Sequence, residues 1–462
     1  MLAVQLARLQ FAATMCFHFI FPPVSIGLGW LVCVADWLAW RRRDPVYEQI
    51  GRLFGKLFAI TFAVGIVSGV VMLFQLGTNW SRYSRFVANV SGAPLAVEGF
   101  FAFFLESTFM GIYLFGRGRV SRRLHWASLF IVTLAATTIS AFPIIAANSW
   151  LQTPAGHVIR DGQAELVSMW GAIFNPSTLP RYGHVITAAL LMGAFIFAGV
   201  GAWHVLRDSS SLLGRKALRM GVFTGLAASV LVIVPSGHIH AQQVARTQPA
   251  KFAAMEGLLT SQTRAPLVLF AIPVPGPTPV LKAKIEVPGL LSYLAFGDVN
   301  ARVQGVEEFP PDERPPLLPT FVSFHAMIAL GNFFLALMAL SAFRLVTGKI
   351  HGDRWLLRIL VWAVPLPMVA IQLGWMTAEV GRQPWIVYKL LRTVDGASPA
   401  VSAPQVRFSL VLLGATCAVL FASWLFLMIR TATATPVAAA APRRTPAEAV
   451  PASHLLRRST WT

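Results

Sequence analysis

The sequence predicts an all-α fold, a polytopic integral membrane protein with nine transmembrane helices. Of its 462 residues, 56% are hydrophobic and only 12% are charged, with a mean hydropathy of +0.63. Soluble domains carry about 25% charged residues, so this composition argues against a soluble protein. The apolar residues gather in runs of about 20, the length with which an α-helix crosses a bilayer. The predicted spans are 12–38, 54–76, 95–115, 124–147, 183–206, 217–236, 320–343, 356–379 and 407–430.

The basic residues predict the orientation of these spans. The formal net charge is +19, but many of its carriers lie in short loops between apolar runs, which fits a role in topology and gives no support for a nucleic-acid partner. Four alternate loops and the C-terminal tail hold Arg41, Arg42, Arg43 and Arg52; Arg117, Arg119, Arg122 and Arg123; Arg207, Arg215, Lys216 and Arg219; Arg344, Lys349, Arg354 and Arg358; and Arg443, Arg444, Arg457 and Arg458. Because positive loops remain in the cytoplasm, we expect the N-terminus outside and the C-terminus inside.

Three regions follow from this pattern. Residues 1–430 are predicted to form the transmembrane core. Within it, 237–319 is a long extracytoplasmic segment, and structureless loops of that length are unusual and usually functional. Residues 431–462, rich in Ala, Pro and Arg, are predicted to be a disordered cytoplasmic tail. The N-terminal apolar run lacks a preceding basic region and a clear cleavage site, so we predict a retained helix rather than a signal peptide.

Several potential ligands lie inside the spans, where ionisable groups are costly and point to function. At the outer ends of five spans the sequence places His18, Glu98, His184, His325, Met327 and Glu379. Each alone has a structural interpretation as a hydrogen-bonded histidine, a core methionine or a salt-bridged carboxylate, but their shared depth favours one site. Imidazole, thioether and carboxylate together suit haem iron more than zinc or magnesium. The three cysteines lie in apolar runs with no CxxCH motif, which argues against covalent haem attachment.

The stretch GWMTAEVGRQPW, residues 374–385, places a carboxylate where an apolar run leaves the membrane. Glu379 is followed three residues later by Arg382, and Pro384 is expected to end the helix. A buried carboxylate at such a boundary calls for a cationic partner or a metal.

Two carboxylates in the third predicted span form a second pattern. Glu98 and Glu106 are eight residues apart, which corresponds to about 80° of rotation and about 12 Å of rise on a helix. They therefore lie on loosely the same side at different depths, and could carry protons from the membrane interior toward the outer cluster. Ser107, Thr108 and Ser140 could extend this path with hydroxyls. The alternative is that one glutamate satisfies a buried arginine.

Four separated motifs resemble subunit I of the cytochrome bd quinol oxidases. They are RLQFAATMCFHFIFPPVSIGLGW, VEGFFAFFLEST, QPAKFAAMEG and GWMTAEVGRQPW. They occur in the family's order, and the resemblance covers about residues 1–430. It implies nine helices, a partner subunit II, a small single-helix accessory subunit, and a bacterial inner-membrane location. It also implies two b-type haems and a haem d, quinol oxidation on the outer side, and reduction of dioxygen to water.

Carried over position by position, the resemblance implies a role for each candidate residue. His184 and Met327 would hold the low-spin haem b. His18 and Glu379 would hold the two high-spin haems, in an order that stays open. Lys251 and Glu256 would lie at the quinol site, and Glu98 and Glu106 would serve proton delivery and the oxygen site. Trp375 would lie among the haems, and Arg382 would hold the charge of Glu379 or a haem propionate.

Two features depart from the family pattern. His325 stands two residues before Met327, where many relatives carry arginine, so a permanently charged group is replaced by one that can be neutral. The segment 237–319 is short for a quinol loop, which points to the short-loop branch with its cyanide-insensitive members, and a further haem b can replace haem d there.

The alternative from another class is a proton-coupled transporter with Glu98, Glu106 and Glu379 as its relay. Transporters usually show inverted repeats, and none is visible.

Overall fold

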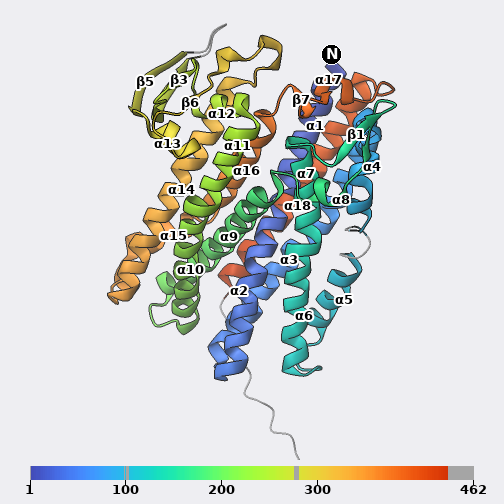
Figure 1. The fold of residues 1–462 in the computed structure, drawn as a ribbon. Coiled ribbons are helices and arrows are strands. Elements are labelled where there is room, and N and C mark those ends of the chain that lie inside the picture. The colour runs from blue at the N-terminus through green and yellow to red at the C-terminus, as the bar shows by residue number, and fades with distance from the viewer. Residues whose placement is uncertain (1, 98, 100–102, 275–279, 435–462) are drawn as a thin grey trace, which may run out of the picture.

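The computed structural model is a bundle of long helices with short helices and hairpins gathered at one end (Figure 1). It describes all residues except 1, 98, 100–102, 275–279 and 435–462. Within the described residues, eight helical stretches are long and apolar enough to cross a membrane. Their helices are α1 (Leu2–His18) with α2 (Phe21–Arg42), α3 (Pro45–Asn79), α6 (Arg122–Ala135) with α7 (Ala141–Gln152), α9 (Thr178–Arg207), α10 (Leu212–Leu231) with α11 (His238–Thr247), α14 (Leu317–Val346), α15 (Arg354–Trp362) with α16 (Leu366–Val380), and α18 (Ala403–Thr433).

The predicted third span, 95–115, falls on the least complete part of the structure. Helix α4 (Ser81–Val97) ends inside it and α5 (Phe103–Phe115) forms its second half, while most of the residues between them lie outside the described part. Alone, the 13 residues of α5 are shorter than the roughly 20 that cross a bilayer. The structure therefore supports a polytopic helical membrane protein with eight described spans and one further apolar helix.

Prolines act differently in two of the predicted spans, both of which are longer in the structure. The first span was expected at 12–38, but helix runs from Leu2 to Arg42 and is interrupted after His18. Pro22 and Pro23 lack the N–H groups that would continue the preceding helix, so α2 starts anew there. The sixth span was expected to end at 236, but Pro235 is accommodated in a π turn, Val232–Gly237, and the helix continues as α11.

The expectation that Pro384 ends the helix after Glu379 was wrong by one turn. Helix α16 ends at Val380, and residues 381–384 form turns before strand β7 (Trp385–Val387). At the other end of the chain, α18 continues to Thr433, so the predicted tail of 431–462 begins inside this helix. Residues 435–462 lie outside the described part.

The connecting segments contain short antiparallel strand pairs that the all-α prediction did not include. They are β1 (His157–Arg160) with β2 (Gln163–Leu166), β3 (Gln262–Thr263) with β6 (Arg302–Val303), β4 (Leu267–Val274) with β5 (Val280–Val287), and β7 with β8 (Leu391–Arg392). The other short helices are α8 (Met169–Ile173), α12 (Pro249–Glu256), α13 (Leu290–Phe296) and α17 (Thr393–Gly396). The 237–319 segment is thus folded over most of its described length, and its strands lie at one end of the bundle (Figure 1).

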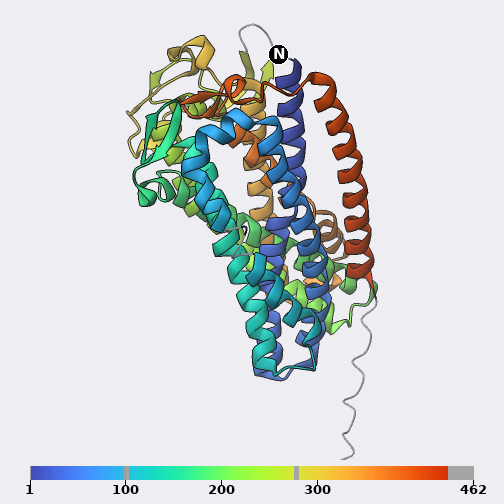
Figure 2. The ribbon, with the colours of Figure 1, turned by 90° about the vertical axis from the view of Figure 1, so that its right-hand side faces the viewer.

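The centre of the bundle is the crossing of α2 and α9. A Cβ atom added at Gly27 would lie 2.1 Å from the carbonyl oxygen of Ala189, and one at Gly193 would lie 2.3 Å from the carbonyl carbon of Gly27. Only glycine permits this backbone contact, which is typical of tightly packed membrane helices. By contrast, α18 runs along the edge of the bundle in Figure 2, with 6% of its most apolar stretch buried against 72% for α9.

Candidate functional site

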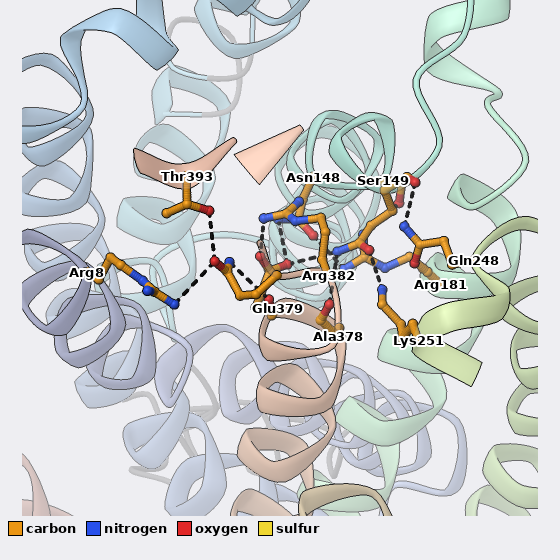
Figure 3. A network of polar contacts seen from close by, with 12 residues as sticks. Arg8, Asn148, Ser149, Arg181, Gln248, Lys251, Ala378, Glu379, Arg382 and Thr393 are labelled. Atoms are coloured by element: carbon orange, nitrogen blue, oxygen red, sulfur yellow. Dashed lines mark hydrogen bonds and ion pairs between the residues drawn. The ribbon is translucent and has the colours of Figure 1, made fainter. Parts of the chain in front are cut away.

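Glu379 lies in a buried polar network at the C-terminal end of α16 (Figure 3). Arg382 donates a hydrogen bond to its Oε2, and the side-chain amides of Asn148 and Gln152 each donate to Oε1 at 3.3 Å. Arg181 at the start of α9 donates to Asn148 at 2.5 Å. The side chains of Glu379 and Arg382 are only 14% and 5% exposed, so this is a buried ion pair.

The cations around Glu379 outnumber the carboxylates. Besides Arg382, both Arg181 and Lys251 act on it electrostatically. The Nε and Nη1 atoms of Arg382 are buried and have no hydrogen-bond partner among the described residues. Guanidinium N–H groups can only donate, and leaving them unpaired in the interior is costly. The donor set therefore fits a ligand with further carboxylate oxygens, such as haem propionates.

Gln152 connects this network to the segment that follows α11. Its Oε1 accepts a hydrogen bond from Nζ of Lys251, and its backbone oxygen accepts one from Gln248 at 2.7 Å. The same amide donates to Glu379. A single side chain at the end of α7 thus joins Lys251, on α12, to the carboxylate on α16 (Figure 3).

Lys251 and Glu256 are both buried in α12, with 5% of each residue exposed. Burial lowers the pKa of the Lys251 amine, and the charges of Arg181 and Arg382 lower it further. Burial raises the pKa of Glu256 to about 8, and its Oε2 has no hydrogen-bond partner in the described part of the chain. Both shifts favour the neutral form, so α12 carries two buried groups that can exchange protons, and of these Lys251 contacts the network.

His18 lies at the break between α1 and α2, where its ring contacts α3. Its Nδ1 is 2.9 Å from Oγ of Ser68, and that hydroxyl donates its only hydrogen to the backbone oxygen of Gly65. When the hydroxyl hydrogen is directed at Gly65, the Ser68 oxygen accepts from the ring, which protonates Nδ1 and leaves the lone pair on Nε2. This is the tautomer in which a histidine binds a metal through Nε2.

Glycines lie beside two of the candidate ligands. A Cβ atom added at Gly69 would lie 3.2 Å from the His18 ring, and one at Gly374 would lie 2.8 Å from the sulfur of Met327. Either side chain would crowd the group that is expected to face iron. The absence of a side chain at these positions lets His18 and Met327 pack directly against the backbones of α3 and α16.

His184 and Met327 approach α11 from different helices. The ring centroid of His184 on α9 is 5.6 Å from that of His240 on α11. Met327 on α14 packs against the apolar cluster that contains Val244 and Ala245 of α11. The two predicted ligands thus both lie around α11, which sequence analysis had placed in the outer loop.

Contacts along α16 give the depths of the candidate ligands relative to Glu379. Gln372 donates to the backbone oxygen of Cys16, two residues before His18, and Gly374 faces Met327. Residues 372–379 of α16 cover about 10 Å along the axis. His18 and Met327 therefore lie about one to two turns deeper than Glu379, in the same half of the bundle.

The remaining predicted site residues are placed as follows. Glu106 is buried on α5 and accepts a 2.6 Å hydrogen bond from Ser140. Trp375 is partly buried on α16, one turn before Glu379. His325 has its two ring nitrogens 3.1 Å and 3.0 Å from the backbone oxygens of Phe321 and Val268. Glu98 lies outside the described residues.

Sequence analysis missed three members of the network, Asn148, Gln152 and Arg181. A signal was present, because Asn148 and Gln152 are four apart and so lie on the same face of a helix, at the C-terminal end of the fourth predicted span. Arg181 lies just before the fifth span, at the same end. Their partner Glu379 is more than 200 residues away from Asn148 in sequence, at a separation of 231.

The fold and the site define a polytopic membrane protein with partly buried imidazole, thioether and carboxylate groups of the kind that bind haem. The chain belongs to the family described as cytochrome bd terminal oxidase subunit I, whose model matches residues 6–436. This family confirms the resemblance seen in the four motifs, and it makes the chain part of a terminal respiratory oxidase.

Relatives match over most of their length. The chain is 37% identical over 436 residues to the cytochrome bd ubiquinol oxidase subunit 1 of Bacillus subtilis (strain 168), covering 92% of each chain. It is 30% identical over 478 residues to the cytochrome bd-II ubiquinol oxidase subunit 1 of Escherichia coli (strain K12), covering 89% of this chain and 92% of the relative. The structure of bd oxidase from Geobacillus thermodenitrificans superimposes with a TM-score of 0.86 at 32% identity, covering 93% of this chain and 98% of that one.

Proposed function

We propose that this chain is the haem-bearing subunit of a quinol oxidase that oxidises quinol at its outer face and reduces dioxygen to water. The observation that carries the proposal is the buried network around Glu379, where cations outnumber the carboxylate and Arg382 keeps unpaired donors. The names of the relatives as ubiquinol oxidases support the enzyme class. The same family membership argues against the alternative of a proton-coupled transporter.

In this proposal the ligands divide among three haems. His184 and Met327 hold a low-spin haem b, and His18 and Glu379 hold the two high-spin haems, a haem b and either haem d or another haem b. When bound, haem supplies one-electron transfer and dioxygen reduction. Arg382 and Arg181 would hold carboxylate groups by charge-assisted hydrogen bonds, and Trp375 would lie among the haems. Ser68, 2.9 Å from Nδ1 of His18, would accept from that nitrogen and leave Nε2 free for iron.

The proposed assembly places this chain in the bacterial inner membrane with nine spans, the N-terminus outside and the C-terminus in the cytoplasm. It pairs with subunit II and with a small single-helix accessory subunit, and the exposed apolar surface of α18 leaves room for lipid or a partner. Quinol protons leave at the outer face near Lys251 and Glu256. Protons for water formation arrive through Glu106 and Glu98, so charge is separated across the membrane.

A visible absorption spectrum of the purified complex tests this proposal. A Soret band with a reduced low-spin signal is expected, and a band in the red distinguishes haem d from a further haem b. A complex of correct subunit composition with no Soret band contradicts the proposal.

Met327→Leu should convert one low-spin haem to a high-spin haem without unfolding the protein, because leucine keeps the volume but offers no thioether ligand. Reduced-minus-oxidised spectra and electron paramagnetic resonance measure the change. Met338→Leu on the same helix is the matched control, since Met338 is fully buried in the apolar core. An unchanged low-spin signal in Met327→Leu rejects Met327 as a ligand.

Glu256→Gln should lower quinol oxidation while sparing dioxygen reduction with an artificial electron donor that bypasses quinol. Because burial raises the pKa of Glu256 to about 8, the group is mainly protonated at pH 7 and accepts protons better as pH rises. Quinol oxidation by the wild type should therefore increase between about pH 7 and pH 9, and this step should vanish in Glu256→Gln. Glu286→Gln, an exposed glutamate of the same segment, is the control. Equal losses with both donors refute a role at the quinol site.

A further inference from the structure

An arginine-lined cavity lies at the end of the bundle opposite the Glu379 network. It is bounded by Trp40, Arg41, Arg43, Arg122 and Arg123, and its volume is about 510 Å³. The first three residues come from the end of α2 and the loop after it, and the other two begin α6. These helices pack against each other, and their ends lie together in Figure 1.

The four arginines of this cavity have no ion-pair partner among the described residues. The acidic side chains of the surrounding segment are already paired: Asp36 with Arg117, Asp44 with Lys216, and Glu48 with Arg52. The Arg123 guanidinium lies 5.9 Å over the ring of Trp40, which fixes one wall of the cavity. Loop topology alone requires basic residues on this side, but it does not require four of them to line one cavity.

We propose that this cavity binds the headgroup of an anionic phospholipid that carries two phosphates, as cardiolipin does. The planar guanidinium group of arginine can donate two hydrogen bonds to one phosphate group. Basic pockets between membrane helices are suited to such headgroups. Four guanidinium groups allow two arginines to hold each of the two phosphates, and the helix N-terminus of α6 adds a positive dipole end. Trp40 provides an aromatic wall at the end of a membrane helix, the depth at which headgroups lie.

Charge argues against the chain's own C-terminal tail as the occupant. Residues 435–462 contain Arg443, Arg444, Arg457 and Arg458 but a single acidic side chain, Glu448. A basic tail is repelled by the cavity. The other candidate occupants are the phosphates of a membrane lipid and free phosphate in solution. These differ in how they reach the site.

The test uses the complete oxidase with its partner subunit, delipidated in detergent and placed in nanodiscs of phosphatidylcholine with or without cardiolipin. The variant is Arg41→Gln/Arg122→Gln, which removes one charge from each helix. The matched control is Arg119→Gln, an exposed arginine of the neighbouring loop that does not line the cavity. Native mass spectrometry measures bound cardiolipin, and thermal unfolding measures its stabilising effect.

Cardiolipin should bind the wild type and Arg119→Gln alike and raise their unfolding temperature. It should bind the double variant about 30-fold more weakly, since each arginine near the headgroup contributes about fivefold. Equal cardiolipin binding by variant and wild type overturns the proposal. So does inorganic phosphate that protects the wild type in detergent as well as cardiolipin does, because the site then takes soluble anions. Loss of the partner subunit with unchanged lipid binding also overturns it and assigns the arginines to a protein contact.

Discussion

Glu106→Gln should lower quinol oxidase activity by about 100-fold or more while the haems remain bound. Glutamine keeps the volume and can still accept the 2.6 Å hydrogen bond from Ser140, but it cannot release a proton. Positioned proton-transfer groups typically contribute a factor of about 10² to 10⁴ to a rate. Steady-state oxygen consumption and a haem spectrum on the same sample measure both parts of the expectation.

The surroundings of Glu106 favour this outcome over a structural role. Glu106 lies about 11 residues into the predicted third span, roughly 16 Å deep, where a charged residue costs about 2.5–3.5 kcal/mol. Ser140 reaches it from a π turn, Ala136–Ser140, and such turns are frequent at functional sites. A purely structural position would be better served by leucine or phenylalanine.

Glu106→Asp is the informative companion variant. It keeps a titratable carboxyl group one methylene short of its position, so a water can bridge the gap and partial activity should remain. If Glu106→Gln turns over at the wild-type rate with its haems intact, Glu106 is a satisfied buried polar group and lies on no obligatory proton path.

The apolar runs predicted the bundle because lipid imposes helices of nearly fixed length. Their exact ends were predicted less well, because proline acts through local geometry. Pro22 and Pro23 divide the first span just after His18, whereas Pro235 is absorbed in a π turn and the helix continues. Strand β5 carries a signal that the all-α prediction overlooked, because Lys282, Lys284 and Glu286 alternate with apolar residues; its partner β4 is almost entirely apolar and depends on pairing with β5.

The Glu379 site was predictable where its contacts are local. Arg382 is three residues from Glu379, so the motif itself brings the ion pair together. Asn148 and Gln152 reach the same carboxylate from another helix, at sequence separations of 231 and 227, and no local pattern encodes such contacts. The link from Lys251 through Gln152 likewise depends on how α12 docks against α7.

Glu379→Gln should destabilise the protein by about 3–5 kcal/mol and remove one haem. The variant leaves Arg382 buried with only a neutral partner, beside Arg181 and Lys251, and an uncompensated buried charge costs about that much. The double variant Glu379→Gln/Arg382→Gln removes the stranded charge and should recover most of the stability, but not the haem. Glu165→Gln, which breaks the exposed pair with Arg160, should cost about 1 kcal/mol or less. Unfolding measured in detergent, together with haem content by pyridine haemochrome, separates the two effects. A Glu379→Gln protein with a full haem complement rejects Glu379 as an iron ligand, and a double variant no more stable than the single one rejects the buried pair as the source of the loss.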